Sequence, residues 1–324
     1  MLHMLGRGLA SVVLFVIVYI ALGGVMSAYS APRPRGERIE IESGRSLRLI
    51  CEGPRSTRPV VWLEAGAFGF SADFGATQAA LVAAGWRTCA YDRAGMGYSD
   101  PGPAPRDGLA IVSDFEKLVD RSGEVGPYIL VGHSMAGLRL REYAGRNPDR
   151  VAGLVFLDAA TPEAAAEPRV VGFIKAFATA SRWAARGAAL GLYKPLSHTG
   201  LGDKIGLPAS AKAEKRWAFG NGRHNRTAAD EVALWLEASN QAAAQPPLNP
   251  EWPVAVLTAG PVKGREEWKA IQAAPARAAR HGMVEHVEAA SHTRLLGQGF
   301  ADHIVRAVAF VAEPAGADTP RKSD

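Results

Sequence analysis

Short apolar runs recur along the chain and form its most regular pattern. Runs of about four to eight residues rich in β-branched and aromatic side chains are typical of strands, and a nearly continuous apolar run indicates a strand buried on both faces. Stretches with helical spacing separate most of them. This alternation predicts a mostly parallel eight-stranded sheet with helices on both faces. Strands are expected at 37–42, 46–52, from 60, 87–91, 128–131, 151–157, 253–258 and 283–288, and helices at 72–84, 111–122, 135–146, 265–281 and 300–312.

The alternation of strand-like and helix-like segments stops over residues 161–249. This stretch is rich in alanine, has few strand-like runs and keeps the spacing of amphipathic helices. Aromatic residues are spread through it, among them Phe173, Phe177 and Trp235. The pattern therefore predicts a helical insertion within the α/β alternation.

Residues 9–28 are uncharged and apolar. A helix of roughly 20 residues can cross a ~30 Å hydrocarbon core, whereas a cleavable signal usually has an apolar core of ~7–15 residues. We therefore predict that residues 1–31 form an uncleaved single-pass anchor, with a cleaved signal ending near Ala28 as the alternative. Arg7 before the run and three arginines after it would keep the domain cytoplasmic by the positive-inside count. N-terminal segments of this kind more often export the domain attached to them, so we expect an extracytoplasmic domain.

Composition excludes several classes of function. The chain has 324 residues, 48% apolar and 21% charged, with a net charge of +5, which is typical of one large globular domain. The basic residues form no stripe with interleaved aromatics, so no nucleic-acid partner is expected. Its eight histidines and two cysteines have no metal-ligand spacing, and no glycine-rich phosphate loop occurs. We expect no metal and no cofactor.

A serine stands between a predicted strand and a predicted helix, in the sequence Val-Gly-His-Ser-Met-Ala-Gly at 131–137. Small residues two positions before and after Ser134, Gly132 and Ala136, permit the tight turn of a nucleophile elbow, which lifts the hydroxyl above the sheet. Ala136 occupies the position where the common motif has its second glycine. The free N–H groups at the start of the following helix favour developing negative charge.

Four stretches together resemble the α/β-hydrolase superfamily over about residues 37–313. They are the strand and loop from Val60 to Gly66, the loop from Tyr91 to Pro101, the elbow, and the strand ending in Phe156-Leu157-Asp158-Ala159. The resemblance implies a core of residues 32–160 and 250–313 and a helical cap of residues 161–249, inserted after the sixth strand. Residues 314–324 are predicted to be a disordered tail.

The superfamily's chain order of nucleophile, acid and histidine implies the catalytic roles. Ser134 is the expected nucleophile. His292 follows the last strand and is the expected base, whereas His286 lies inside a predicted strand and His303 inside a predicted helix. The usual place of the acid in the superfamily is the loop after the penultimate strand, which has no aspartate here. Some members have it at the end of the sixth strand instead, and this resemblance implies that Asp158 is the acid. The alternative acids, in the loop after the penultimate strand, are Glu266 and Glu267.

The resemblance also implies backbone donors for an oxyanion, the N–H groups of Met135 and Ala67. Glu64 stands near the second donor without an assigned role, and Asp92 with Arg93 is expected to form a structural ion pair or to order a loop. We predict a membrane-anchored serine hydrolase acting on a small, partly apolar acyl compound. Cofactor-free haloperoxidase-like or lyase chemistry on the same residues is the alternative, as is a non-catalytic binding protein of this fold.

The two cysteines, Cys51 and Cys89, fall on strands that the superfamily sheet order makes antiparallel neighbours. Neighbouring strands lie ~4.8 Å apart, and a disulfide needs Cα atoms ~4.4–6.8 Å apart. A bridge is therefore possible. Two separate buried thiols are the alternative at this point, because cysteine is readily buried as a small apolar residue.

Overall fold

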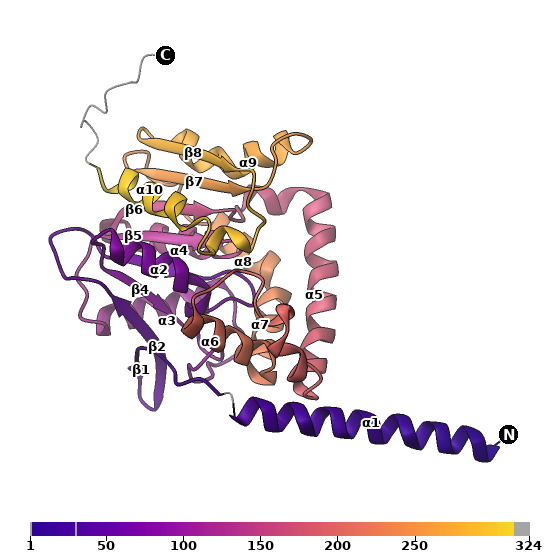
Figure 1. Cartoon of the computed structure of the whole chain (residues 1–324). Coiled ribbons are helices and arrows are strands. Elements are labelled where there is room, and N and C mark those ends of the chain that lie inside the picture. Colours follow the sequence, from indigo (N-terminus) through magenta and orange to yellow (C-terminus); the bar gives the residue numbers. More distant parts are fainter. Residues whose placement is uncertain (1, 30, 314–324) are drawn as a thin grey trace.

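Eight strands form one sheet in the order β1-β2-β4-β3-β5-β6-β7-β8, and most of them are labelled in Figure 1. The computed structural model describes residues 2–29 and 31–313, so the predicted tail at 314–324 lies outside the described residues. β2 is antiparallel to β1 and β4, and all other pairings are parallel. The strands are β1 (Glu37–Glu42), β2 (Arg45–Glu52), β3 (Val61–Glu64), β4 (Thr88–Tyr91), β5 (Tyr128–His133), β6 (Val151–Leu157), β7 (Val254–Ala259) and β8 (Gly282–Val287).

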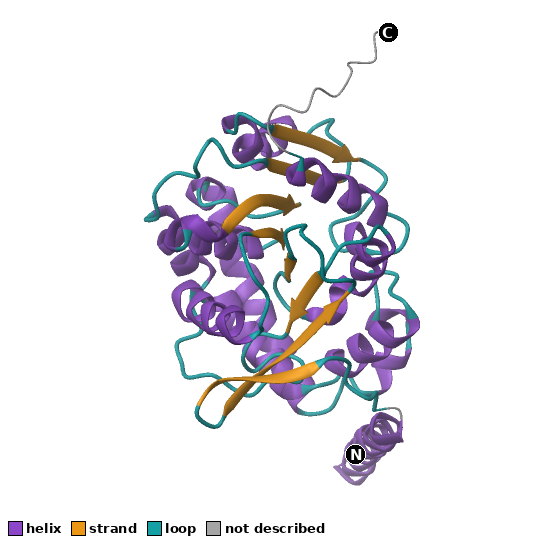
Figure 2. Ribbon diagram, turned by 90° about the vertical axis from the view of Figure 1, so that its left-hand side faces the viewer, coloured by secondary structure: helices purple, strands orange, loops and turns teal. Residues whose placement is uncertain are grey.

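Helices cover both faces of the sheet, which confirms the predicted fold class (Figures 1 and 2). One face carries α2 (Gly75–Ala83) and α10 (Ala301–Ala312). The other carries α3 (Gly108–Arg121), α4 (Ala136–Arg146) and α9 (Glu266–Ala278). Side chains alternate between the two faces along each strand, as the two-residue repeat requires. On β5, for example, Ile129 and Val131 belong to the first core and Tyr128 and Leu130 to the second.

The observed ends of two helices differ from the predicted ends, because local backbone conformation and capping hydrogen bonds determine where a helix begins and stops. The third helix begins at Gly108 instead of residue 111, because the Asp107 side chain accepts a hydrogen bond from the Ala110 N–H and caps it. The ninth ends at Ala278 instead of residue 281, because the chain is extended at Ala279. Such end effects involve one or two hydrogen bonds and leave little trace in apolar spacing.

Four helices lie between β6 and β7 and gather along one side of the sheet (Figure 1). They are α5 (Pro168–Ala189), α6 (Ala209–Phe219), α7 (Gly222–Ala233) and α8 (Trp235–Ala243), with short 3₁₀ turns at Pro195–His198 (η4) and Gly200–Gly202 (η5). α5 packs along α7, and Trp235 meets Phe173 and Phe177 edge to face. We call this helical insertion the cap.

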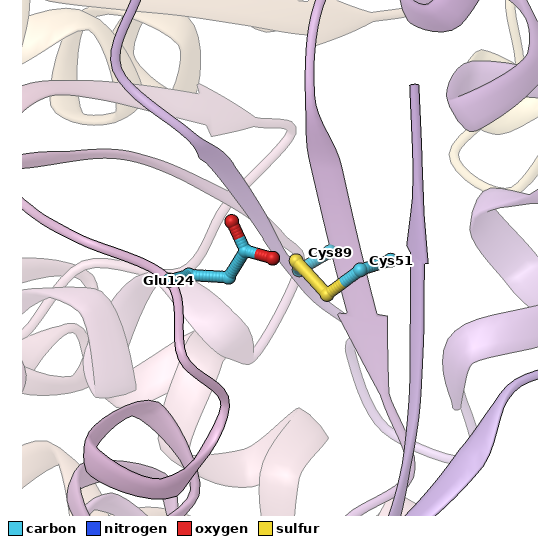
Figure 3. A group of neighbouring side chains, drawn as sticks. All are labelled: Cys51, Cys89 and Glu124. Carbon is cyan, nitrogen blue, oxygen red and sulfur yellow. A yellow bond between two sulfur atoms is a disulfide. The ribbon is translucent and has the colours of Figure 1, made fainter. Parts of the chain in front are cut away.

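A disulfide joins Cys51 of β2 to Cys89 of β4, which are direct partners in the antiparallel ladder (Figure 3). Their Cα atoms are 4.1 Å apart. The sequence allowed either a disulfide or two separate thiols, and the structure contains the disulfide. Glu124 lies beside it and completes a group with metal-ligand spacing. Its carboxylate pairs with Arg87 at 2.7 Å, and the bonded sulfurs are not thiolates, so the group does not have the chemistry of a metal site.

The N-terminal helix α1 (Leu2–Tyr29) projects from the domain beside the lower end of α5 (Figure 1). Within it, residues Arg7–Tyr29 have a mean hydropathy of 2.6 and are almost wholly exposed. Such a helix has the length and composition of either a membrane anchor or a signal segment.

Candidate active site

Ser134 lies on a sharp turn between β5 and α4. Its φ of 57° is in the left-handed region, which a non-glycine residue rarely adopts and which is common at functional turns. The turn is tied to the end of β6: the Ser134 N–H donates to Leu157 O at 3.0 Å, and Ser134 O accepts from the Ala160 N–H at 2.9 Å. The geometry is that of a nucleophile elbow.

The second small residue that the elbow needs is Gly137, one position later than in the common motif. A Cβ at Gly137 would lie 2.4 Å from the backbone oxygen of Ala160, so the loop after β6 closes directly on the helix start. Ala136 is fully buried at the first turn of α4, where a methyl group fits. The imperfect sequence match therefore leaves the turn intact.

His292 and Asp158 come together from loops far apart in sequence. Asp158 follows β6 and His292 follows β8, along one edge of the sheet. His292 Nδ1 lies 2.6 Å from Asp158 Oδ2. Since a carboxylate accepts, Nδ1 carries the proton, and Nε2 is left to accept a proton from another group.

Asp158 is held by groups that the sequence analysis did not anticipate. Its Oδ1 accepts from the Ala259 N–H at 3.2 Å and from Gln272 Nε2 at 3.0 Å, and Lys269 Nζ lies 3.9 Å away. Burial alone would raise the pKa of Asp158, but the hydrogen bonds and the neighbouring His292 outweigh it and lower the pKa to about 2. The carboxylate is thus ionised throughout the neutral range.

A signal for Gln272 and Lys269 does exist in the sequence. They lie three residues apart on α9, on a helix otherwise rich in alanine, and both are buried. Polar residues at i and i+3 share one helix face. Their partner, however, follows a strand more than 100 residues earlier, and spacing alone does not reveal it.

His133, the residue before the nucleophile, contacts the loop that carries His292. Its ring lies 4.5 Å from the His292 ring, and its Nε2 donates to His292 O at 2.9 Å. Burial, together with the nearby His292, lowers the pKa of His133 to about 3, so the ring is neutral. Because a carbonyl only accepts, the proton of His133 is on Nε2. This contact positions the loop of the expected base.

The loop after β3 lies directly against the nucleophile. A Cβ at Gly66 would lie 2.7 Å from Ser134 Cβ, so only glycine allows the approach. The next residue is Ala67, whose N–H was predicted to face an oxyanion together with that of Met135 at the start of α4. In the described part of the chain neither N–H donates a hydrogen bond to the backbone. Both amides are therefore available to a ligand.

Arg93 fixes the loop after β3 through hydrogen bonds to its backbone. Its guanidinium donates to the carbonyl oxygens of Ala65 and Gly66 at 2.8 and 3.0 Å. Glu64 pairs with it at 3.0 Å, and Glu231 of α7 pairs with it at 2.8 Å. The predicted loop-ordering role of Arg93 thus has a geometric basis, and Glu64 has a partner. The cap reaches the oxyanion loop through Glu231.

Ser134, His292 and Asp158 line one cavity of about 1080 Å³ between the cap and the sheet. Within the described ranges, no hydrogen bond joins the Ser134 hydroxyl to His292. Such contacts are often longer before substrate binds. The cavity wall is mainly apolar and includes Phe68, Ile174, Phe177, Leu201, Ile205 and Trp235.

The other candidate residues have different partners. Glu266 accepts from the Gly264 N–H at the start of α9 and is exposed, as is Glu267. His286 contacts Thr258 Oγ1, and His303 contacts Glu285. None of these four residues lies against His292, in contrast to Asp158.

A polar cluster on the cavity wall was missed by the sequence analysis. Lys215 Nζ of α6 lies 2.8 Å from Asp73 and also donates to Phe68 O at 3.2 Å. His224 Nε2 of α7 donates to the same carbonyl at 3.2 Å. Burial lowers the pKa of His224 to about 3. Cap and core thus share hydrogen bonds at Phe68, next to the oxyanion loop.

Comparisons with known proteins identify the fold family. The sequence model of the alpha/beta hydrolase fold matches residues 59–268. A probable transporter, efuK of Hormonema carpetanum, is 37% identical over 129 residues, which are 38% of this chain and 18% of that protein. The probable esterase PIR7A of Oryza sativa subsp. indica is 40% identical over 90 residues, 26% of this chain and 33% of that protein. The matched regions thus span a third or less of these relatives.

A solved structure of a thermophilic esterase from Thermogutta terrifontis superposes with a TM-score of 0.59 at 19% identity. The match covers 85% of this chain and 97% of the esterase, and at this identity it shows the shared fold alone. The family match, by contrast, extends over well over half of the sequence. The chain therefore belongs to the α/β-hydrolase fold family.

Proposed function

We propose that the protein is a serine hydrolase that cleaves an ester or a related acyl compound through an acyl-enzyme on Ser134. The observation that carries this proposal is the 2.6 Å contact between His292 Nδ1 and Asp158, beside a serine on a strained elbow in the same cavity. A hydroxyl is a weak nucleophile at neutral pH and needs such a base.

In the proposed reaction, His292 Nε2 takes the proton of Ser134 as its oxygen attacks the acyl carbon. The Met135 and Ala67 N–H groups stabilise the oxyanion that forms. His292 then protonates the leaving alcohol, and the Ser134 ester remains. Water activated by His292 releases the acid. Asp158 stabilises the imidazolium in both halves without taking the proton, consistent with its low pKa.

We further propose that the substrate is a small-molecule acyl compound, partly apolar in structure, and that α1 is an uncleaved anchor. The apolar cavity wall supports the first point. The hydropathy of Arg7–Tyr29 supports the second. An extracytoplasmic domain is favoured by the Cys51–Cys89 bond, because disulfides persist in oxidising compartments.

The test uses the full-length chain in detergent with a fluorophosphonate probe and a panel of esters. Ser134→Ala is expected to abolish labelling and to lower turnover on the order of 10⁴–10⁶-fold. Ser291→Ala is the matched control, an exposed serine beside His292, and is expected to keep both. Substantial labelling of Ser134→Ala would refute the assignment of the nucleophile.

A further inference from the structure

The contact between α1 and the cap fixes where a membrane would lie. Tyr19 donates from its hydroxyl to Leu192 O at 3.1 Å, and Gly23 lies so close to Pro195 that a Cβ there would be 2.5 Å from the proline ring. Gly191 also faces Ile20. The cap therefore packs on the middle of the apolar helix and not on its end.

This contact leaves too little free helix to span a bilayer alone. Only residues 8–18 of the apolar segment lie between Arg7 and the cap contact. At ~1.5 Å per residue they extend roughly 16 Å, whereas the hydrocarbon core is ~30 Å thick. A bilayer around the whole apolar segment must therefore reach the cap residues that face Tyr19 and Gly23.

The linker keeps the domain in this arrangement. Arg35, a few residues after α1, donates from its backbone N–H and its guanidinium to the carboxylate of Glu214 on α6. Glu214 is buried and also pairs with Arg48 at 3.0 Å. The cap thus contacts both α1 and the linker that follows it, at two separate points.

The cap surface beside α1 has the composition of a membrane interface. Leu190 is 65% exposed and directly precedes Gly191, the residue that faces Ile20. Trp183, also 65% exposed, lies on α5 two turns before Leu190, the C-cap residue of that helix. Tryptophan is enriched where membrane meets water, and exposed apolar residues near a membrane helix point to lipid contact.

The same stretch of the cap also forms part of the cavity wall. Tyr193 lines the cavity and lies between Leu192 and Pro195, which contact α1. Leu201 and Lys204, later in the same segment, line the cavity as well. The cavity volume of about 1080 Å³ lies slightly above the ~300–1,000 Å³ typical of small-molecule sites. Its wall is mainly apolar, which favours a hydrocarbon chain.

We propose that cap residues 190–205 lie in the membrane surface and that the cavity takes the acyl chain of a lipid ester directly from the bilayer. The second half of this proposal rests on the proposed esterase activity, and the first half does not. The ligand class is thus an amphiphile with a long acyl chain, held by the membrane until it enters the cavity.

The first experiment measures how deeply residue 190 lies in the bilayer and does not depend on enzyme activity. Leu190→Cys and Val125→Cys are made in the full-length chain, labelled with an environment-sensitive fluorophore and reconstituted in phosphatidylcholine vesicles that contain doxyl lipid. The two native cysteines are bonded, so only the new thiol reacts. Val125 is 82% exposed, in the loop between α3 and β5, and is the control. We expect the doxyl lipid to quench the fluorescence of the label at residue 190 strongly and that of the label at residue 125 not at all. Absence of quenching at 190 overturns the proposal.

The second experiment tests the route of the substrate. Leu190→Glu and Val125→Glu are compared on a water-soluble short-chain ester and on a monoacylglycerol held in phosphatidylcholine vesicles. Leu190→Glu is expected to lower turnover of the vesicle-held ester at least about tenfold and to leave the short-chain rate unchanged, because a carboxylate resists entry into lipid. Equal effects of both variants on the vesicle-held ester overturn the bilayer route.

The experiments distinguish failure of the proposed esterase activity from failure of the proposed membrane contact. If the unmodified chain hydrolyses neither ester, the proposed esterase activity fails, while quenching still decides the membrane contact. If Leu190→Glu also loses the short-chain rate, the comparison is repeated with Trp183→Ser. A selective loss on the vesicle-held ester in that variant supports the route, and an unchanged rate overturns it.

Discussion

At the residue scale, the Asp158 carboxylate has more partners than an exposed loop acid would have. Two neutral donors, the Ala259 N–H and Gln272, bind one oxygen and leave the other to His292. This division fixes the carboxylate plane and therefore the direction of the histidine ring. An amide in place of the carboxylate would keep the shape but lose the charge that stabilises an imidazolium.

Asp158→Asn is accordingly expected to lower kcat on the order of 10²–10⁴-fold, less than Ser134→Ala, and to keep the fold. Steady-state kinetics on the best ester of the panel measures the loss, and circular dichroism checks the fold. Glu267→Gln is the control and is expected to have full activity. A fully active Asp158→Asn combined with an inactive Glu266→Gln or Glu267→Gln would move the acid to the loop after β7.

A second residue-scale prediction concerns Glu142 on α4. Its side chain is fully buried, and neither carboxylate oxygen has a hydrogen-bond partner among the described residues. Burial raises its pKa from 4.5 to about 7, with Arg146, 3.9 Å away, opposing the change. The folded state therefore binds this proton more tightly than the unfolded chain. The stabilisation is full below about pH 4.5 and is lost as the pH rises through about 7.

Glu142→Gln removes this titration. Between pH 5 and pH 8 the unfolding free energy of the variant is expected to gain roughly 1–3 kcal/mol relative to that of the natural chain. Urea denaturation at the two pH values measures it. Glu37→Gln, at an exposed position on β1, should show no such difference. The absence of a relative change would mean that Glu142 is already ionised at pH 5 in the folded protein, which contradicts the prediction.

Residues of the candidate site differ in how far the sequence revealed them. Ser134, His292 and Asp158 were found because each comes shortly after a strand, and the carboxyl ends of parallel strands meet at one edge of the sheet. Their roles remain predictions. Gln272, Lys215 and His224 were missed because they lie on helices, and helix spacing gives a face but not the element it packs on.

At the element scale, most strands were located within one or two residues because a buried parallel strand is apolar throughout. The sequence left the connection between β2 and β4 undecided. Two cysteines on neighbouring strands face each other only in one register, and a shift by one residue would turn one side chain to the opposite face. The direct pairing of Cys51 with Cys89 depends on that register.

The disulfide is expected to stabilise the domain through the chain it encloses. The two cysteines are 38 residues apart, which in the chain-entropy account corresponds to ~3–4 kcal/mol. Replacement of both cysteines by serine should lower the unfolding free energy by about this amount. Urea titration with and without reductant measures it, and reductant should not affect the double variant. Two alkylated cysteines in unreduced protein from the native membrane would show that the bond is absent there.

At the scale of the whole molecule, the open question is whether residues 1–31 stay attached. The sequence alone allowed an anchor and a cleaved signal, because both require an apolar helix. The structure adds that this helix packs on the folded domain through Tyr19 and Gly23. A signal segment is removed during export, so it does not need to pack on the folded domain. An anchor that also orients the domain does need such packing.

We therefore expect full-length protein to remain in the membrane fraction after alkaline carbonate extraction and to have an intact mass that includes residues 1–31. A Gly23→Leu variant is expected to stay in the membrane but to lose part of its thermal stability, since a larger side chain cannot fit against Pro195. Gly8→Leu, on the exposed part of α1, is the control and should unfold as the natural chain does. A soluble chain that begins between Ala28 and Ala31 would identify a cleaved signal and remove the physical basis for a cap fixed at the bilayer.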